Sequence, residues 1–113
     1  MKNWYVIHTQ TGSEDKVRDS LERRIASQEM QDLITKVIIP VEQVSEIRSG
    51  KRRISQRKFF PGYLLVEMVL NEETYFLIKK TPGVTGFIGL GKKPMPLPQQ
   101  DVDKIIQRTE HGF

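Results

Sequence analysis

Six basic residues and no acidic residue are concentrated in residues 48–58. The other 12 basic and 14 acidic residues give the rest of the chain a charge of −2, so this segment carries the whole positive excess. Clustered cationic side chains can bind phosphate groups or an acidic protein face. They can also simply keep an exposed hairpin tip soluble. If phosphate is the partner, we expect the backbone of a nucleic acid to be contacted by Arg52, Arg53, Arg57 and Lys58.

A second set of residues with binding chemistry is aromatic and comes from two separate segments: Trp4, Tyr5, Phe59, Phe60 and Tyr63. Adjacent strands would bring several of these rings together. Alternation along a strand sends Trp4 and Tyr5 to opposite faces of a sheet. One ring set could therefore anchor a partner, although all five rings could also be core. Between the rings, Pro61 and Gly62 are expected to shape the backbone at the rim of such a pocket.

Residues suited to covalent or metal chemistry are sparse. The chain contains no cysteine, which excludes disulfides, thiolate nucleophiles and cysteine-bound metals. The two histidines, His8 and His111, are far apart in the sequence and form no metal-binding motif. Ser13 and Asp15 have no spacing to His8 that indicates a catalytic triad, and no glycine-rich phosphate loop is present. We expect no enzymatic activity, no cofactor and no metal.

The composition is that of one globular domain, residues 1–113, with 37% hydrophobic and 28% charged residues. Apolar runs such as residues 63–66 are far shorter than the about 20 residues needed to cross a bilayer. The N-terminus also lacks the apolar core of a signal peptide. We therefore expect a cytoplasmic protein that does not enter a membrane. We also expect a monomer, because an exposed apolar pocket would be covered by its partner.

The first half of the chain reads as strand, helix and strand. Residues 4–9 are aromatic and β-branched, which is typical of a strand. Residues 13–30 predict an amphipathic helix, because apolar side chains recur every fourth position at Val17, Leu21 and Ile25. The spacing Thr11-x-x-Glu14 indicates a capping box at its start. A short buried strand is expected at residues 37–39.

The second half of the chain continues the alternation of strands and helices. Polar stretches on both sides of Ser49-Gly50 predict a hairpin that carries the basic segment, and residues 63–70 predict a central strand. Asn71 indicates the start of a second helix, which Pro82 and Gly83 should end. A strand at residues 84–90 and a last helix follow, with inward-facing Val102, Ile105 and Ile106. The order βαββαβ plus a helix predicts an α+β, ferredoxin-like (RNP-like) split βαβ sandwich. It would have an antiparallel sheet of about four strands, a protruding basic hairpin and about three helices, with the second face of the sheet partly open.

Four segments of the chain resemble, in order, the N-terminal domain of the NusG family of bacterial transcription factors: WYVIHTQTGSEDKV, RKFFPGYLLVEM, TPGVTGFIG and PLPQQDVDKI. The resemblance spans the whole chain, and FPGY followed by an apolar strand is its most distinctive part. It implies a transcription elongation factor domain without enzymatic activity that modulates pausing, elongation and termination. In the family pattern a linker and a C-terminal KOW domain follow, and neither is present after Phe113. Contacts with Rho or with a ribosomal protein belong to that second domain and are not expected here.

The resemblance also implies partners and site residues. The domain would bind the clamp helices of the RNA polymerase β′ subunit, reach the β lobe across the DNA channel, and lie near the non-template strand and the upstream DNA. Its polymerase-binding residues would be Trp4, Tyr5, Phe59, Phe60, Pro61, Gly62 and Tyr63, with Tyr5, Phe60 and Tyr63 in the pocket itself. Lys79, Lys80 and Thr81 resemble the family region near the single-stranded DNA. The two lysines could instead only complement the dipole of a helix end.

A competing interpretation is a single-stranded RNA-binding module of the RRM type. The expected fold is similar to that of an RRM, and residues 57–63 faintly resemble its aromatic sheet motif. Pro61 would interrupt that motif, and the strand after it presents Leu64, Val66 and Met68 where an RRM needs aromatic rings.

Overall fold

A four-stranded antiparallel sheet in the order β2-β5-β1-β6 forms the centre of the computed structural model, which describes residues 2–58, 60–90 and 93–111. Its strands are β1 (Lys2–Thr9), β2 (Ile34–Ile38), β5 (Tyr63–Val69) and β6 (Val84–Phe87). With the helices between them, this strand order is that of a split βαβ sandwich. The α+β fold class predicted from the sequence is confirmed.

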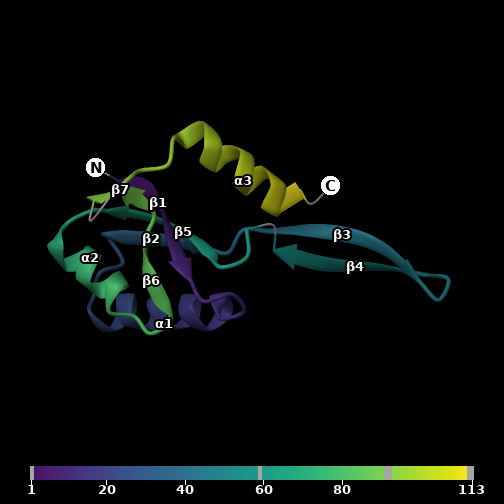
Figure 1. Ribbon diagram of the computed structural model, residues 1–113, viewed down its shortest axis with the longest axis horizontal. Helices are drawn as coiled ribbons and strands as arrows, with labels where there is room; N and C mark the ends of the chain where they lie inside the picture. Colours follow the sequence, from purple (N-terminus) through teal and green to yellow (C-terminus); the bar gives the residue numbers. More distant parts are fainter. Residues whose placement is uncertain (1, 59, 91–92, 112–113) are drawn as a thin grey trace.

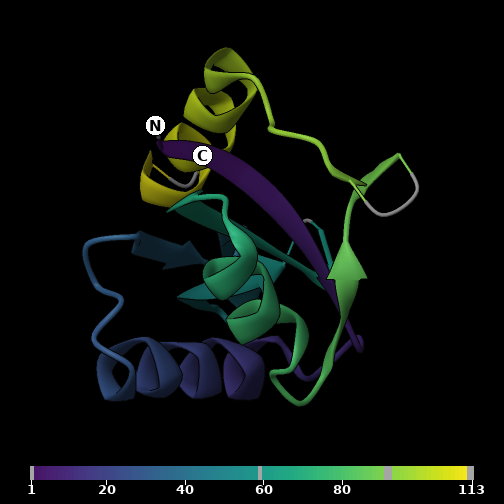
Figure 2. The ribbon, with the colours of Figure 1, turned by 90° about the vertical axis from the view of Figure 1, so that its left-hand side faces the viewer.

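Three helices cover the two faces of this sheet: α1 (Glu14–Ser27), α2 (Glu72–Lys79) and α3 (Gln99–His111). Figure 2 shows α1 and α2 against one face and α3 across the other. Each face therefore has its own core, and alternation along β1 supplies both of them. Tyr5 belongs to the larger cluster with α1 and α2, whereas Trp4 packs with Leu65 and Val102 under α3. The predicted separation of Trp4 and Tyr5 is confirmed.

The first helix buries the apolar stripe that was predicted for it. Val17, Leu21 and Ile25 all lie in the core. Its start differs from the prediction. The N-cap residue is Ser13, which makes no side-chain capping hydrogen bond. The carboxylate of Glu14 instead accepts hydrogen bonds from the backbone N–H groups of Gly12 and Gly62. The capping box inferred from Thr11-x-x-Glu14 is therefore wrong, since Glu14 is held by two loops and not by its own cap.

The hairpin is a separate two-stranded sheet of β3 (Val41–Arg48) and β4 (Lys51–Lys58). Its register is regular from Val41 opposite Lys58 to Arg48 opposite Lys51. The turn residues Ser49 and Gly50 both have positive φ, at 54° and 75°, as in the turn type that suits two-residue hairpins. Figure 1 shows this arm extending away from the main sheet, which gives the molecule its 53 Å length against 28 and 26 Å in the other directions. The predicted hairpin is confirmed.

The second helix begins as predicted. Asn71 accepts a hydrogen bond from the Thr74 N–H at 2.9 Å, and the Thr74 hydroxyl oxygen accepts one from the Asn71 N–H at 3.0 Å. The expected strand at residues 84–90 is divided at Ile88 into β6 and β7 (Gly89–Leu90), and β7 pairs with β8 (Lys93–Pro94). A backbone hydrogen bond of 2.7 Å from the Leu97 N–H to the Trp4 carbonyl then leads the chain into α3.

Candidate docking surface

The chain makes a tight turn at residues 60–63, just before β5. The Phe60 carbonyl accepts a hydrogen bond from the Tyr63 N–H at 3.2 Å. Pro61 occupies the second position, where its ring fixes φ, and Gly62 has a φ of +86° at the third. This is the residue pattern of a type II turn. It leaves the Phe60 side chain 45% exposed and starts β5 at Tyr63.

Gly62 is held from both sides by the body of the domain. Its N–H donates to Glu14 Oε2 at 2.9 Å, and its carbonyl accepts from the Thr9 N–H at 2.7 Å. A Cβ at this position would lie 3.1 Å from Thr11 Oγ1 and 3.3 Å from the Thr9 carbonyl oxygen. The turn is therefore fixed against the end of β1 and the start of α1, and a side chain at position 62 would be both strained and crowded.

Tyr63 lies beside His8 on the neighbouring strand. The two rings have centroids 5.1 Å apart and are tilted by 36°. The Thr85 hydroxyl lies 3.0 Å from His8 Nδ1 and donates to the His8 carbonyl oxygen at 2.7 Å. His8 is exposed and Tyr63 is half-buried. We name the exposed surface made by His8, Phe60, Pro61 and Tyr63 the docking patch.

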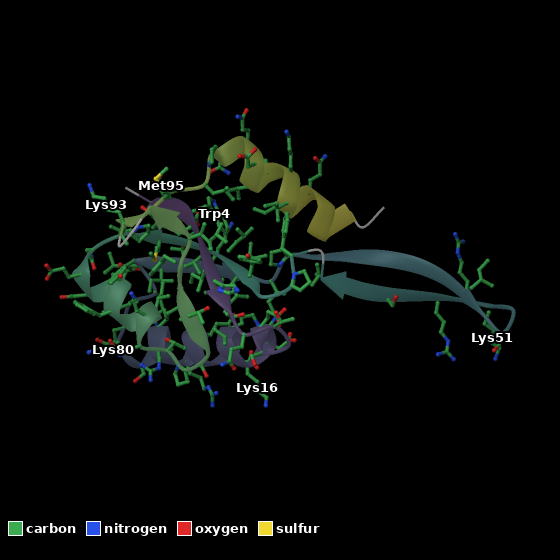
Figure 3. The ribbon with its side chains drawn as sticks, viewed as in Figure 1. Trp4, Lys16, Lys51, Lys80, Lys93 and Met95 are labelled. Carbon is green, nitrogen blue, oxygen red and sulfur yellow. The ribbon has the colours of Figure 1, made fainter. Side chains whose placement is uncertain are left out.

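The structure changes the assignment of Trp4 and Tyr5. Trp4 is 3% exposed and lies below α3 (Figure 3), and Tyr5 is 4% exposed and meets Phe87 edge to face with ring centroids 6.3 Å apart. Neither side chain is part of the exposed surface. Both are core residues in this structure, so their inclusion among the contact residues is revised. Phe59 lies outside the described residues.

The end of α2 carries two exposed lysines, each near an aromatic ring of the same helix. Lys79 Nζ lies 5.4 Å from the centre of the Tyr75 ring, and Lys80 Nζ lies 5.5 Å from the centre of the Phe76 ring. Thr81 differs from them: it is 2% exposed, and its hydroxyl donates to the Leu77 carbonyl at 2.7 Å. Of the three predicted residues in this region, the two lysines are exposed and Thr81 is buried.

The tip of the hairpin is basic and partly apolar. Lys51, Arg52 and Arg53 are exposed, and Figure 3 shows Lys51 at the far end of the arm. Ile47 is paired with Arg52 across the hairpin and is also exposed. The side chains of Arg57 and Lys58 lie outside the described part of the chain, so their predicted contacts stay predictions.

Three residues of these surfaces were missed by sequence reasoning: His8, Ile47 and Phe76. Phe76 is 51% exposed although it sits in an amphipathic helix. Its position three and four residues before Lys79 and Lys80 could have indicated this, because such neighbours share a helix face. His8 could have been found from its expected place beside Tyr63 across two adjacent strands.

Within residues 2–58, 60–90 and 93–111, no group of three or more histidine, aspartate or glutamate side chains could hold a metal ion. In the same part of the chain, no helix is long and apolar enough to cross a membrane.

Comparison with known proteins identifies the family of this chain. A family model described as transcription termination factor nusG matches residues 2–106. The chain belongs to the NusG family. Proteins named transcription termination/antitermination protein NusG are 47% identical in Halalkalibacterium halodurans and 44% in Bacillus subtilis, each over 95% of this chain, and 43% in Neisseria meningitidis over 99% of it. The chain spans 62%, 62% and 64% of these relatives, which is less than two thirds of their length.

Solved structures agree with the NusG assignment. The NusG of Thermotoga maritima, in a structure titled for its domain interaction, superposes with a TM-score of 0.78 at 29% identity, over 96% of this chain and 57% of that one. An Spt4 heterodimer complex from Methanococcus jannaschii matches with a TM-score of 0.60 at 18% identity, over 92% and 95% of the two chains. This second likeness is one of fold.

Proposed function

We propose that this NusG-family domain is a transcription elongation factor module that docks on RNA polymerase and modulates pausing, elongation and termination. The docking patch would receive the clamp helices of the polymerase β′ subunit. The opposite parts of the domain would approach the β lobe and the DNA, so that the domain bridges the DNA channel. We place this activity in the cytoplasm, with the domain acting as a monomer.

The observation that supports this proposal most is an aromatic surface on a fixed backbone. Phe60 is 45% exposed at one end of a turn whose glycine is hydrogen-bonded on both sides, and the Tyr63 ring at the other end packs on His8. Rigid aromatic side chains are frequent anchors of protein interfaces, and an amphipathic helix is a common occupant of an apolar groove. A surface that is already ordered loses less conformational entropy when it binds.

The cationic surfaces support proximity to nucleic acid. The exposed Lys51, Arg52 and Arg53 lie at the tip of an arm that extends from the domain, where they can reach phosphates that the main body does not touch. Lys79 and Lys80 offer a second cationic surface at the end of α2. We propose that the arm lies near upstream DNA and that α2 lies near the non-template strand.

The proposed activity is a shift of populations and involves no bond chemistry. A factor favours the elongating state of its polymerase only if it binds that state more tightly than the paused one. Simultaneous contact with two sides of a channel would provide such a difference wherever the two sides lie at different distances in the two states.

The proposal is tested first by an NMR titration of the chain with an isolated coiled coil of the β′ clamp helices, and separately with a generic single-stranded RNA. We expect shifts at His8, Phe60 and Tyr63 with the coiled coil and none there with the RNA. Shifts confined to the RNA titration and spread over the sheet would replace the proposal with the RNA-binding alternative.

The structure removes one argument against that alternative and adds another. Leu64, Val66 and Met68 were expected where an RRM needs aromatic rings, but all three are buried in the core with α1 and α2, which corrects that expectation. On the other face of the sheet, α3 covers Trp4. A ring that lies below a helix cannot stack on a base unless that helix moves, so the buried Trp4 disfavours RNA binding on the sheet.

A further inference from the structure

We infer that Glu14 is a positioning residue for docking: its buried carboxylate holds the turn of residues 60–63 in the form that presents Phe60 and Tyr63. This inference rests on the proposed function, because it names the residue on which the geometry of the docking patch depends.

Glu14 is remote from the turn in sequence but joined to it in space. It is 1% exposed, and each of its two carboxylate oxygens accepts a backbone N–H from a different segment. Oε1 accepts from Gly12, in the loop before α1, and Oε2 accepts from Gly62 at 2.9 Å, 48 positions along the chain. One side chain thus links the start of α1 to the turn before β5.

The chemistry of this link requires a carboxylate. Both contacts come from donors, so both side-chain oxygens must be acceptors, and an ionised carboxylate is the side chain that accepts with both. A glutamine in the same position would turn its NH₂ group toward one of the two N–H groups. Glu14 is also the first residue of α1, where the helix dipole is positive.

The turn depends on this acceptor. Gly62 is the third residue of the turn, and its N–H, which the Phe60–Tyr63 hydrogen bond does not use, donates to Glu14. Without the carboxylate this N–H would lose its acceptor in a buried site, which is costly enough to displace the backbone. Phe60 and Tyr63 are the two ends of the turn, so a displaced Gly62 changes their relative placement and the shape offered to a helix. Glu14 itself is buried and makes no direct contact with the partner.

The test compares Glu14→Gln with Asp15→Asn in the 113-residue chain. Asp15 is the next residue of α1 and is exposed, and Asp15→Asn removes the same charge at the same helix end. We expect Glu14→Gln to weaken binding of the clamp-helix coiled coil about tenfold, because a displaced turn would have to return to its docking form when the partner binds, and Asp15→Asn to leave it unchanged. The NMR signal of the Gly62 amide should move in the free Glu14→Gln chain and stay in place in Asp15→Asn.

A merely structural role is distinguished by repeating the pair in a Phe60→Ala background. If Glu14 acts through the turn, Glu14→Gln should weaken binding much less once the Phe60 ring is gone. The same tenfold loss in both backgrounds would overturn the inference, as would a folded Glu14→Gln chain that binds normally. Failure of both the unmodified chain and Asp15→Asn to bind would instead overturn the proposed function.

If Glu14→Gln does not fold, hydrogen exchange in the unmodified chain tests whether the carboxylate holds the turn. The Gly62 amide should be protected in the free domain to the level of the β1–β5 core. Exchange at the rate of an open loop would mean that the carboxylate does not hold the turn, and the inference would fail.

Discussion

The rings of His8 and Tyr63 lie 5.1 Å apart on β1 and β5, at positions that are directly paired in the sheet. Direct pairing places the two side chains on the same face, and the hydroxyl of Thr85 lies 3.0 Å from Nδ1 of the histidine. The Tyr63 ring is therefore supported along one side and open to solvent along another. This relationship explains how the Tyr63 ring can be supported by a neighbour and still be partly exposed.

Tyr63→Ala should weaken binding of the clamp-helix coiled coil by about 2 kcal/mol or more, the loss expected for an aromatic anchor. Isothermal titration calorimetry measures it. Tyr63→Phe keeps the ring and should bind within about threefold of the unmodified chain, because the contact proposed is made by the ring and not by its hydroxyl. A folded Tyr63→Ala chain with normal affinity would remove Tyr63 from the docking patch.

Gly62→Ala should destabilise the domain more than Gly12→Ala. Both glycines have positive φ, +86° and +93°, so each substitution costs about 1–2 kcal/mol of backbone strain. A Cβ at Gly62 would also press on Thr11 and Thr9, whereas nothing lies within 4 Å of one at Gly12. Urea unfolding of both variants measures the difference. Equal losses would show that the neighbours of Gly62 yield freely.

Arg52→Glu combined with Arg53→Glu should lower the affinity for duplex DNA and reduce its salt dependence. Each phosphate contact removed lowers the slope of log K against log salt by roughly 0.9. The fold should be retained, because the arm extends beyond the main sheet. Lys16→Glu, an exposed charge reversal on α1, is the control. A slope that is the same in the hairpin variant and in the unmodified chain would exclude the arm from the DNA contact.

Asn71→Ala should cost about 1 kcal/mol of stability, because it removes the acceptor of the Thr74 N–H at the start of α2. Asn71→Asp keeps an acceptor and adds a favourable charge at the helix N-terminus, so it should be neutral or slightly stabilising. Thermal unfolding of the pair provides the comparison. An equal loss in both variants would mean that the amide group itself is needed.

Val102→Ala should destabilise the small core under α3 by about 2 kcal/mol, since it removes two fully buried methyl groups. Trp4 is the single tryptophan of the chain and packs in this cluster, so its fluorescence reports on the site. We expect emission shifted to the red. The neighbouring Asp103→Ala, at an exposed position, should change neither quantity.

Short-range patterns in the sequence predicted the three helices, the hairpin and the main strands in their order. They did not predict β8, and they placed β2 (Ile34–Ile38) at residues 37–39. The four-residue spacing of Val17, Leu21 and Ile25 predicted α1 and the face that it buries, because helical geometry is local. The Ser49-Gly50 turn and the Asn71 cap were found for the same reason, since the turn conformation and the cap depend on a few adjacent residues. The family was recognisable from four short motifs, and the family model confirmed it.

Tertiary structure alone decided which side chains remain available. Trp4 is an aromatic residue in a family motif, yet its burial depends on α3, which begins 95 positions later. Thr81 turns its hydroxyl to its own helix, and Glu14, which looked like part of a cap, holds a glycine 48 residues away. Spacing along a chain describes neighbours in one element. Exposure and hydrogen-bond partners depend on which elements meet in space. In the docking patch, they depend on the contacts among β1, β5 and the start of α1.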